Sequence, residues 1–411
     1  MPKISFMKEK TINRAFYDDL VERSIGKGLI VVLTGQRRVG KSYILKSIKD
    51  KKENIDGNNV IYIDKENREF DAISTYRELN DYIAARYDAT RHNYILIDEV
   101  QDIDGFEKSV RSWRKEAHTD VIITGSNAHI LSGDLTTLIG GRYRQLYILP
   151  LSYKEFMEFH NLEDNDETLA LYINLGGLPG LRRFGLEDLN GVRQYQNDVY
   201  NTALFKDVVL RNEIRNTVFL ENLSRFIADN IGKPISVNSI SKYMKGQGEK
   251  VTPSAVGNYL KYLSEAYIMH YVPRFDIHGK LLLTTNGKFY FEDHGIRNAL
   301  VGGTRQNDIE KLIENIVYQE LIRLGYKVNV GQLQAGEVDF VCTRHDGDDR
   351  IYIQTSYLIA GDDTYQREFG TLRRINDNYP KYVISMSPLI SRNDDAGITH
   401  LHLRRFLTEG L

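Results

Sequence analysis

The chain has 411 residues, of which 41% are hydrophobic and 27% are charged, close to the average of soluble globular proteins. This composition excludes a disordered, collagen-like or coiled-coil chain, and the length predicts two to three domains of roughly 150 residues each. Lys and Arg number 54 against 56 Asp and Glu, so the formal net charge is −2, which indicates neither nucleic acid nor an anionic membrane as a partner.

Cysteine content and hydropathy together predict the compartment. Cys342 is the single cysteine, which excludes an intrachain disulfide and a cysteine zinc site. The segment Met1–Lys10 lacks the apolar core of a secretory signal, and no stretch approaches the ~20 apolar residues of a membrane span. We therefore expect a soluble, cytoplasmic protein with no membrane partner.

Residues 1–150 alternate short apolar runs with amphipathic stretches, a pattern typical of a doubly wound α/β domain with a parallel sheet. Most of the runs are nearly continuous in Val, Ile, Leu or Tyr, as strands buried on both faces should be. The predicted strands are Leu29–Leu33, Val60–Ile63, Tyr94–Ile97, Val121–Ile123 and Tyr143–Leu149.

A phosphate-binding loop follows the first predicted strand. The segment fits the pattern G-x-x-x-x-G-K-[ST] and leads into a helical run that begins at Tyr43. In such a loop successive backbone N–H groups surround the phosphates, the lysine reaches the β- and γ-phosphates, and the serine hydroxyl binds Mg²⁺. We expect ATP and Mg²⁺ as cofactors, held by Gly35, Gln36, Arg37, Arg38, Val39, Gly40, Lys41, Ser42 and Tyr43.

An acidic pair follows the third predicted strand. Asp98 and Glu99 stand where a parallel strand reaches the carboxyl edge of its sheet, the edge that faces the ligand. Asp98 would complete the Mg²⁺ shell together with Ser42, and Glu99 would take a proton from the water that attacks the γ-phosphate.

Two further positions carry alternatives. Ser126 and Asn127 follow the fourth strand, where either could orient the attacking water or serve only as a helix cap. Arg142 and Arg144 precede or begin the fifth strand, where an arginine could stabilise the transition state or be a surface charge. We keep Asn127 and Arg142 as candidate catalytic residues.

The middle of the chain is predicted to be helical. We expect a helical lid over residues 151–225 and a winged-helix module over 226–303, with Thr252 as N-cap and Pro253 at the first position of the second helix. A hairpin is expected through Pro273–Gly279. Between residues 235 and 280, six basic residues against three acidic ones give +3, so DNA is one alternative partner.

Residues 304–411 are predicted to form an α/β domain that resembles the core of restriction endonucleases. Such chemistry needs Mg²⁺ carboxylates on adjacent strands and a nearby lysine. Glu314 and Asp339 are present, but Gln354 and Ser356 stand where Glu and Lys are usual. Nuclease activity is therefore not expected, and the domain would serve binding or assembly.

The chain as a whole resembles a group of bacterial and archaeal AAA-type ATPases with a C-terminal region of uncharacterised role. The resemblance begins with the phosphate loop and continues through most of the chain, in the segments Ile97–Gln101, Thr124–Ala128, Gly140–Tyr143, Leu149–Phe156, Gly176–Pro179, Lys288–Asp293 and Glu337–Phe340.

That resemblance implies further roles. Ser126 or Asn127 would occupy the sensor-1 position, Arg142 would be the arginine finger, and Pro179 would pack near the adenine. By spacing alone, Gly177–Pro179 could equally be a turn that ends a helix. It implies a Mg²⁺-dependent ATPase that couples its nucleotide state to the C-terminal domains. The alternative is a nucleotide-gated DNA-binding switch with slow hydrolysis. Oligomers are possible, and the sequence does not decide whether Arg142 acts within one subunit or between two.

Overall fold

The computed structural model describes residues 14–131, 140–305, 308–334, 336–344, 349–388 and 397–411, so the segment Met1–Lys10 lies outside the described residues. The chain divides into two compact units between Ile148 and Leu149, next to the predicted boundary at residue 150. Each unit is described by itself below, and the finer boundaries at residues 225 and 303 stay predictions.

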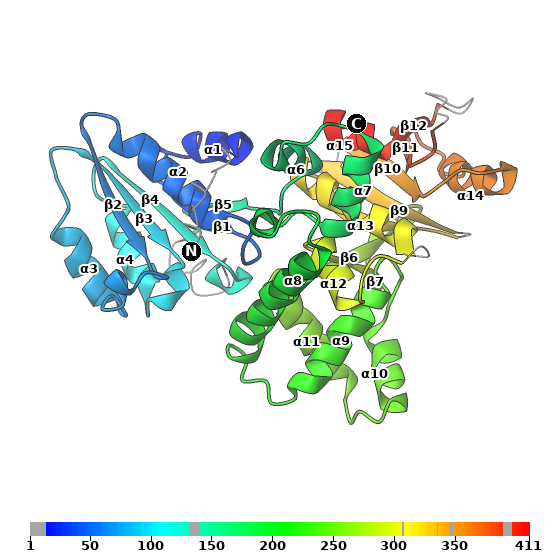
Figure 1. Ribbon diagram of the computed structural model, residues 1–411, viewed down its shortest axis with the longest axis horizontal. Coiled ribbons are helices and arrows are strands. Elements are labelled where there is room, and N and C mark those ends of the chain that lie inside the picture. The colour runs from blue at the N-terminus through cyan, green and yellow to red at the C-terminus, as the bar shows by residue number, and fades with distance from the viewer. Residues whose placement is uncertain (1–13, 132–139, 306–307, 335, 345–348, 389–396) are drawn as a thin grey trace, which may run out of the picture. The chain divides into compact units, whose positions relative to one another are not determined.

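The first unit is built on a parallel five-stranded sheet with the strand order β2-β3-β4-β1-β5, which confirms the predicted α/β class (Figure 1). The strands β2, β3 and β4 extend one or two residues beyond both ends of the predicted runs, β1 is shifted by one residue toward the C-terminus, and β5 ends before Ile148. The strands are β1 (Ile30–Thr34), β2 (Asn58–Asp64), β3 (His92–Asp98), β4 (Thr119–Gly125) and β5 (Tyr143–Tyr147).

Helices cover both faces of this sheet, α1 and α2 on one side and α3 and α4 on the other (Figure 1). Alternate strand residues such as Ile95 and Ile97 pack with Leu79 and Val110 of the latter pair, because successive side chains of a strand point to opposite faces. The helices are α1 (Ala15–Glu22), α2 (Lys41–Glu53), α3 (Tyr76–Ala84) and α4 (Phe106–Trp113), with 3₁₀ turns η1 (Arg68–Phe70), η2 (Val100–Asp102) and η3 (Ala128–Leu131).

The second unit begins with a mostly helical region. The predicted caps are confirmed at α11, where the Thr252 hydroxyl accepts from the Ala255 N–H and Pro253 is the first helical residue. No helix in the described ranges has the length and apolar character to cross a membrane. The elements are α6 (Tyr153–His160), α7 (Asp166–Leu175), the 3₁₀ turn η4 (Pro179–Arg183), α8 (Leu189–Ala203), the π-helix η5 (Leu204–Val209), α9 (Thr217–Asp229), α10 (Val237–Gly246) and α11 (Pro253–Glu265).

A mixed seven-stranded sheet follows, in the order β12-β11-β10-β9-β8-β6-β7. The predicted hairpin is present as β6 and β7, but β6 also pairs in parallel with β8, so the hairpin belongs to the same sheet as the strands beyond residue 303. The strands are β6 (Met269–Asp276), β7 (Leu281–Phe291), β8 (Lys327–Leu333), β9 (Gly336–Arg344), β10 (Asp349–Ser356), β11 (Lys381–Ser385) and β12 (Thr399–His402). The helices are α12 (His294–Leu300), α13 (Ile309–Arg323), α14 (Asp362–Arg373) and α15 (Leu403–Glu409). The C-terminal region is thus α/β as predicted, while the names winged helix and endonuclease-like stay predictions.

Candidate nucleotide site

The predicted phosphate loop joins the end of β1 to the start of α2. Gly35 has φ +143°, and a Cβ there would lie 2.2 Å from the carbonyl oxygen of Ile148, so only glycine fits the close approach of the two backbones. Gly40 precedes α2 with φ +102°, a conformation that other residues rarely adopt. Each glycine of the motif is therefore required for its own reason: Gly35 by the close approach to Ile148, and Gly40 by its positive φ.

Lys41 lies inside the loop, with 4% of its surface exposed. Its ammonium donates to the carbonyl oxygens of Gly35 and Gln36, each at 2.9 Å. These bonds hold the Lys41 ammonium inside the loop that would surround a phosphate. Of the other predicted loop residues, Gln36 and Val39 are buried, Arg37 and Ser42 are half-buried, and Arg38 and Tyr43 are exposed.

The acidic pair lies at the carboxyl end of β3. Asp98 is the last residue of the strand, and Glu99 has the left-handed φ of +51°, which is strained for a residue with a side chain. Thr124 of β4 links the pair, because its hydroxyl donates to Asp98 and accepts from the Glu99 N–H at 2.9 Å. The side-chain amide of Gln101 donates to the Glu99 carboxylate.

The two carboxyl groups have opposite pKa shifts. Burial raises the pKa of Asp98, although hydrogen bonds from Ser42 and Thr124 oppose this. Burial alone would also raise the pKa of Glu99, but the positive charges of Lys41 and Arg37, together with hydrogen bonds from Gln101 and Ser126, lower it below its ordinary value. The lowered pKa favours the ionised form of Glu99, the form that a general base needs.

Strand order brings the third predicted element to the same edge. β4 lies between β1 and β3, so the residues after β4 lie between the phosphate loop and the acidic pair. Ser126 and Asn127 are both fully buried there, and the Ser126 hydroxyl hydrogen-bonds to Glu99. The structure thus places Ser126 in contact with the proposed base, while the role of Asn127 stays a prediction.

Two residues of this site escaped the sequence analysis. Arg14, just before α1, is buried and donates from Nη1 to the Val39 carbonyl oxygen at 3.0 Å, which ties the loop to the first helix. Asp64 ends β2 in register with Asp98 and forms an ion pair with Lys46 at 3.8 Å. Asp64 follows an apolar run just as Asp98 does, a signal that could have found it, whereas nothing local marks Arg14.

The structure does not bring Arg142 to this edge. Arg142 is exposed and its carbonyl oxygen accepts from the Ile30 N–H, at the amino end of β1 and β5. The phosphate loop lies at the other end of β1, whose five residues span about 16 Å at roughly 3.3 Å each. Pro179 belongs to the second unit, where it begins η4, and its proposed adenine contact stays a prediction.

The oxygen donors here suit magnesium. Ser42 and Asp98 offer a hydroxyl and a carboxylate in hydrogen-bond contact with each other, and Asp64 adds a second carboxylate nearby. Mg²⁺ usually takes one or two carboxylates and completes its shell with water and substrate phosphates. The residues present therefore fit a Mg²⁺ ion that arrives with a nucleotide.

Comparison with known proteins agrees with this geometry. A model of the AAA domain matches residues 27–157, and a domain of unknown function, DUF8612, matches residues 166–307. An uncharacterised protein of Haemophilus influenzae is 31% identical over 386 residues, which cover 92% of this chain and 94% of that protein. The chain belongs to the same family. Its first unit is an AAA-type P-loop domain, as the motifs predicted.

The chain is also similar to a more distant relative and to a solved structure. An uncharacterised protein of Methanocaldococcus jannaschii is 28% identical over 365 residues, which cover 85% of this chain and 78% of that protein. Among solved structures, a Walker-type ATPase of Pyrococcus abyssi aligns with a TM-score of 0.51 at 15% identity, over 71% of this chain and 97% of that one. This last likeness is one of fold.

Proposed function

We propose that the protein is a Mg²⁺-dependent ATPase of AAA type that binds ATP, hydrolyses it to ADP and phosphate, and couples its nucleotide state to the C-terminal region. The observation that carries the proposal is the meeting of Lys41, Asp98 and Glu99 at one edge of the parallel sheet. Lys41 and Arg37 lower the pKa of Glu99, so the groups that would bind phosphate and activate water already interact electrostatically.

Each residue has a defined task in this proposal. The loop N–H groups and the Lys41 ammonium hold the β- and γ-phosphates, and Ser42 with Asp98 would hold Mg²⁺, which neutralises phosphate charge when bound. The Glu99 carboxylate accepts a proton from the attacking water. Gln101 and Ser126, which hydrogen-bond to Glu99, orient that carboxylate.

Phosphate release from ATP tests the proposal. Wild type should release phosphate only with Mg²⁺, and Lys41→Met should lower turnover about 10²–10³-fold, the usual cost of losing one donor to transition-state charge. Lys49→Met is the matched control, because Lys49 lies on the same helix and pairs only locally, with Asp50 and Glu53. Equal turnover in wild type and Lys41→Met would refute the proposed phosphate site.

The position of Arg142 favours action between subunits. Arg142 lies at the amino end of β5, whereas the phosphate loop lies at the carboxyl end of the neighbouring strand β1. This separation supports a role for Arg142 at a nucleotide site in another copy of the chain. We therefore propose that Arg142, if it is an arginine finger, serves a neighbouring subunit, which requires the protein to oligomerise when ATP is bound.

Contacts within the second unit support coupling of the predicted lid. The Gly177 N–H donates to Asp293 Oδ2 at 2.8 Å, and His294 Nε2 lies 2.7 Å from the Tyr172 carbonyl oxygen. These bonds join the Gly176–Pro179 loop and the end of α7 to α12. A displacement of this loop would therefore pass directly to α12 and to β7, which contacts it.

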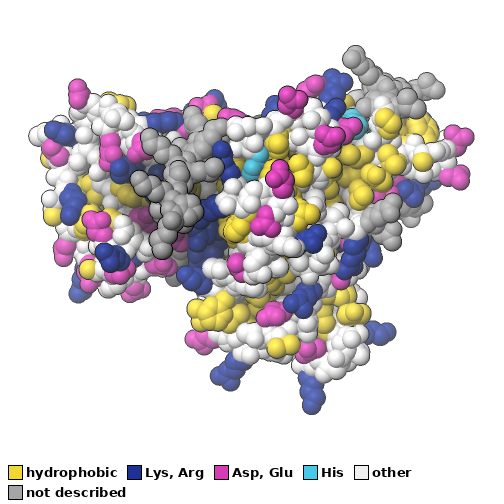
Figure 2. Space-filling model, viewed as in Figure 1, with side chains coloured by type: hydrophobic (Ala, Val, Ile, Leu, Met, Phe, Trp, Pro, Cys, Tyr) yellow, Lys and Arg dark blue, Asp and Glu magenta, His cyan; other side chains and the backbone are white. Residues whose placement is uncertain are grey.

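A second candidate function is a nucleotide-gated DNA-binding switch, favoured by the exposed face of α10 and α11. Ser254, Asn258 and Lys261 are exposed on α11, and Lys242 and Lys245 are exposed on α10. Figure 2 shows Lys and Arg side chains standing out from the surface over this module. Hydroxyl, amide and ammonium groups on one helix suit contacts to phosphates and base edges.

Binding of a fluorescent DNA duplex at two salt concentrations, with and without ATP, tests this second function. Affinity should fall as salt rises, with a slope of roughly −0.9 per phosphate neutralised. Lys242→Ser with Lys245→Ser should weaken binding and flatten the slope, whereas Lys49→Ser on α2 should change neither. An affinity that ignores salt, ATP and the two lysines would exclude DNA as the ligand of this face.

A further inference from the structure

The π-helix η5 and the residues after it carry large apolar side chains on the surface. Phe205 and Leu210 leave 56% and 59% of their surfaces exposed, and Val218, near the start of α9, leaves 64%. The Leu210 N–H donates to the Phe205 carbonyl oxygen at 2.9 Å, so these two residues lie one turn apart on the same side. Figure 2 shows hydrophobic side chains on the surface of the second unit near the end of α8, which leads into η5. Neighbouring exposed apolar side chains indicate an interaction surface.

The basic residues of this segment are not neutralised by their surroundings. Lys206 and Arg211 each follow one of the two apolar residues in the chain, and both are exposed. Like Arg215, they form no ion pair and no side-chain hydrogen bond within the part of the chain that the structure describes. Glu213 is the one exposed carboxylate between residues 205 and 218, so the positive charge is in excess. The η5 surface, as we name it, consists of Phe205, Lys206, Leu210 and Arg211.

The make-up of the η5 surface favours a protein as its partner. The bases of nucleic acid stack on aromatic rings, whereas Leu210 is aliphatic. A membrane would need a continuous apolar face, but the exposed residues of α8 between positions 190 and 202 are polar: Asn190, Gln194, Asp198, Asn201 and Thr202. The complementary groups are therefore apolar side chains and carboxylates of a protein surface.

The chain itself carries such a surface at the start of α14. Leu358 is 40% exposed, and Ala360, two residues later, is exposed as well. Asp362 and Asp363 lie exposed in the first turn of α14 and form no ion pair or side-chain hydrogen bond with any residue that the structure describes. These four residues make up what we name the α14 surface. Its two carboxylates complement the two cations of the η5 surface, and both surfaces carry two apolar side chains.

We propose that the η5 surface of one copy of the chain binds the α14 surface of a second copy. Figure 1 shows α14 on the far side of the second unit from α8, which leads into η5, so the two surfaces of one copy do not meet each other. The apolar side chains form the centre of the contact, and the cations of one copy pair with the carboxylates of the next. Because the two surfaces differ, each copy binds two neighbours, which builds a ring or an open chain of copies.

This contact gives Arg142 the neighbouring subunit that its proposed role requires, and in that respect the inference rests on the proposed function. The contact itself does not involve the nucleotide, since both surfaces belong to the second unit. Association is therefore expected with and without ATP.

Sedimentation velocity of the full chain over a range of concentrations, without nucleotide and with ATP and Mg²⁺, tests the proposal. Wild type should self-associate in both conditions. Lys206→Glu with Arg211→Glu should weaken association at least about tenfold, because like charges then face each other across the contact. Asp362→Lys with Asp363→Lys should weaken it to a similar extent.

A mixture of these two double variants separates a direct contact from a general effect of charge. Each variant alone should be largely monomeric, whereas the equimolar mixture should associate, because the acidic η5 surface of one then meets the basic α14 surface of the other. The chain with all four substitutions should associate for the same reason. The matched control is Lys242→Glu with Lys245→Glu, an equal change of charge on α10, which should leave association unchanged.

Three results would overturn the proposal: a wild type that stays monomeric, an association that ignores both charge reversals, or a mixture that fails to associate. Binding of oligothymidylate or of phosphatidylserine vesicles by a monomeric wild type, lost in Lys206→Glu with Arg211→Glu, would assign the η5 surface to nucleic acid or to a membrane instead. Circular dichroism checks the fold of each variant. ATP binding and turnover are measured on the same samples, so a failure of this contact is distinguishable from a failure of the proposed ATPase.

Discussion

Replacing Glu99 by Gln is expected to lower ATP turnover about 10²–10⁴-fold, the range that a positioned general base contributes. The amide keeps the size of the side chain and its contacts with Gln101 and Ser126, but it cannot accept a proton from water. Lys41 and the loop N–H groups are unchanged, so ATP binding should persist. The measurement is single-turnover hydrolysis of ATP together with equilibrium binding of a fluorescent ATP analogue.

The matched control for this experiment is Glu66→Gln, which removes an exposed carboxylate of the same unit. Its turnover should equal that of the wild type. Loss of ATP binding in Glu99→Gln would indicate that Glu99 supports the fold of the site and not the chemistry. Unchanged turnover would exclude it as the base, and Asp64, which lies in register with Asp98, would become the next carboxylate to test.

The nucleotide site could be predicted because its determinants are local. The loop motif needs a strand before it and a helix after it, and the runs around Leu33 and Ile44 supply both within a few residues. Asp98 could be placed for the same reason, because a polar residue that ends a buried strand lies at the ligand edge of a parallel sheet. Hydrophobic pattern and turn chemistry therefore determine this part of the molecule.

Contacts between distant segments could not be predicted in this way. Arg14 reaches Val39 across 25 residues, and Lys288 reaches Asp339 across 51. Lys288 is the single charged residue of its strand, and hydropathy alone would predict that such a residue is exposed to solvent. The sequence left open whether Arg142 acts within one subunit or between two, and the register of β5 against β1 places it next to the start of β1, at the end of the sheet away from the phosphate loop.

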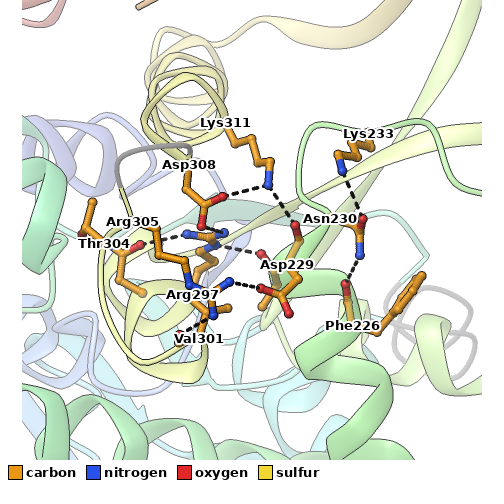
Figure 3. Close-up of polar contacts among 12 residues, drawn as sticks. Phe226, Asp229, Asn230, Lys233, Arg297, Val301, Thr304, Arg305, Asp308 and Lys311 are labelled. Carbon is orange, nitrogen blue, oxygen red and sulfur yellow. Dashed lines mark hydrogen bonds and ion pairs between the residues drawn. The ribbon is translucent and has the colours of Figure 1, made fainter. Parts of the chain in front are cut away.

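Arg297 is a buried cation whose loss should strongly destabilise the second unit. It is fully buried, its Nε donates to the Ala228 carbonyl oxygen at 2.7 Å, and its Nη2 lies 2.8 Å from Asp308 (Figure 3). Lys311 donates to Asp308 at 2.8 Å and to the Asp229 carbonyl oxygen at 3.0 Å. The last carbonyl groups of α9 are thus bound by cations, which also complement the negative end of the helix dipole.

Arg297→Met is therefore expected to lower the free energy of unfolding by about 3–5 kcal/mol, the usual cost of breaking a buried ion pair from one side. Methionine fills the volume but leaves the Ala228 carbonyl oxygen without this donor and Asp308 with one cation fewer. Urea unfolding followed by circular dichroism measures the change.

Arg305→Met is the control in the same network, because Arg305 is 58% exposed and pairs with Asp229 at 3.2 Å, so its loss should cost less than about 1 kcal/mol. Adding Asp308→Asn to Arg297→Met should cost less than the two single changes together, since both remove the same pair. Equal effects of Arg297→Met and Arg305→Met would show that burial of the Arg297 pair does not determine the stability of this unit.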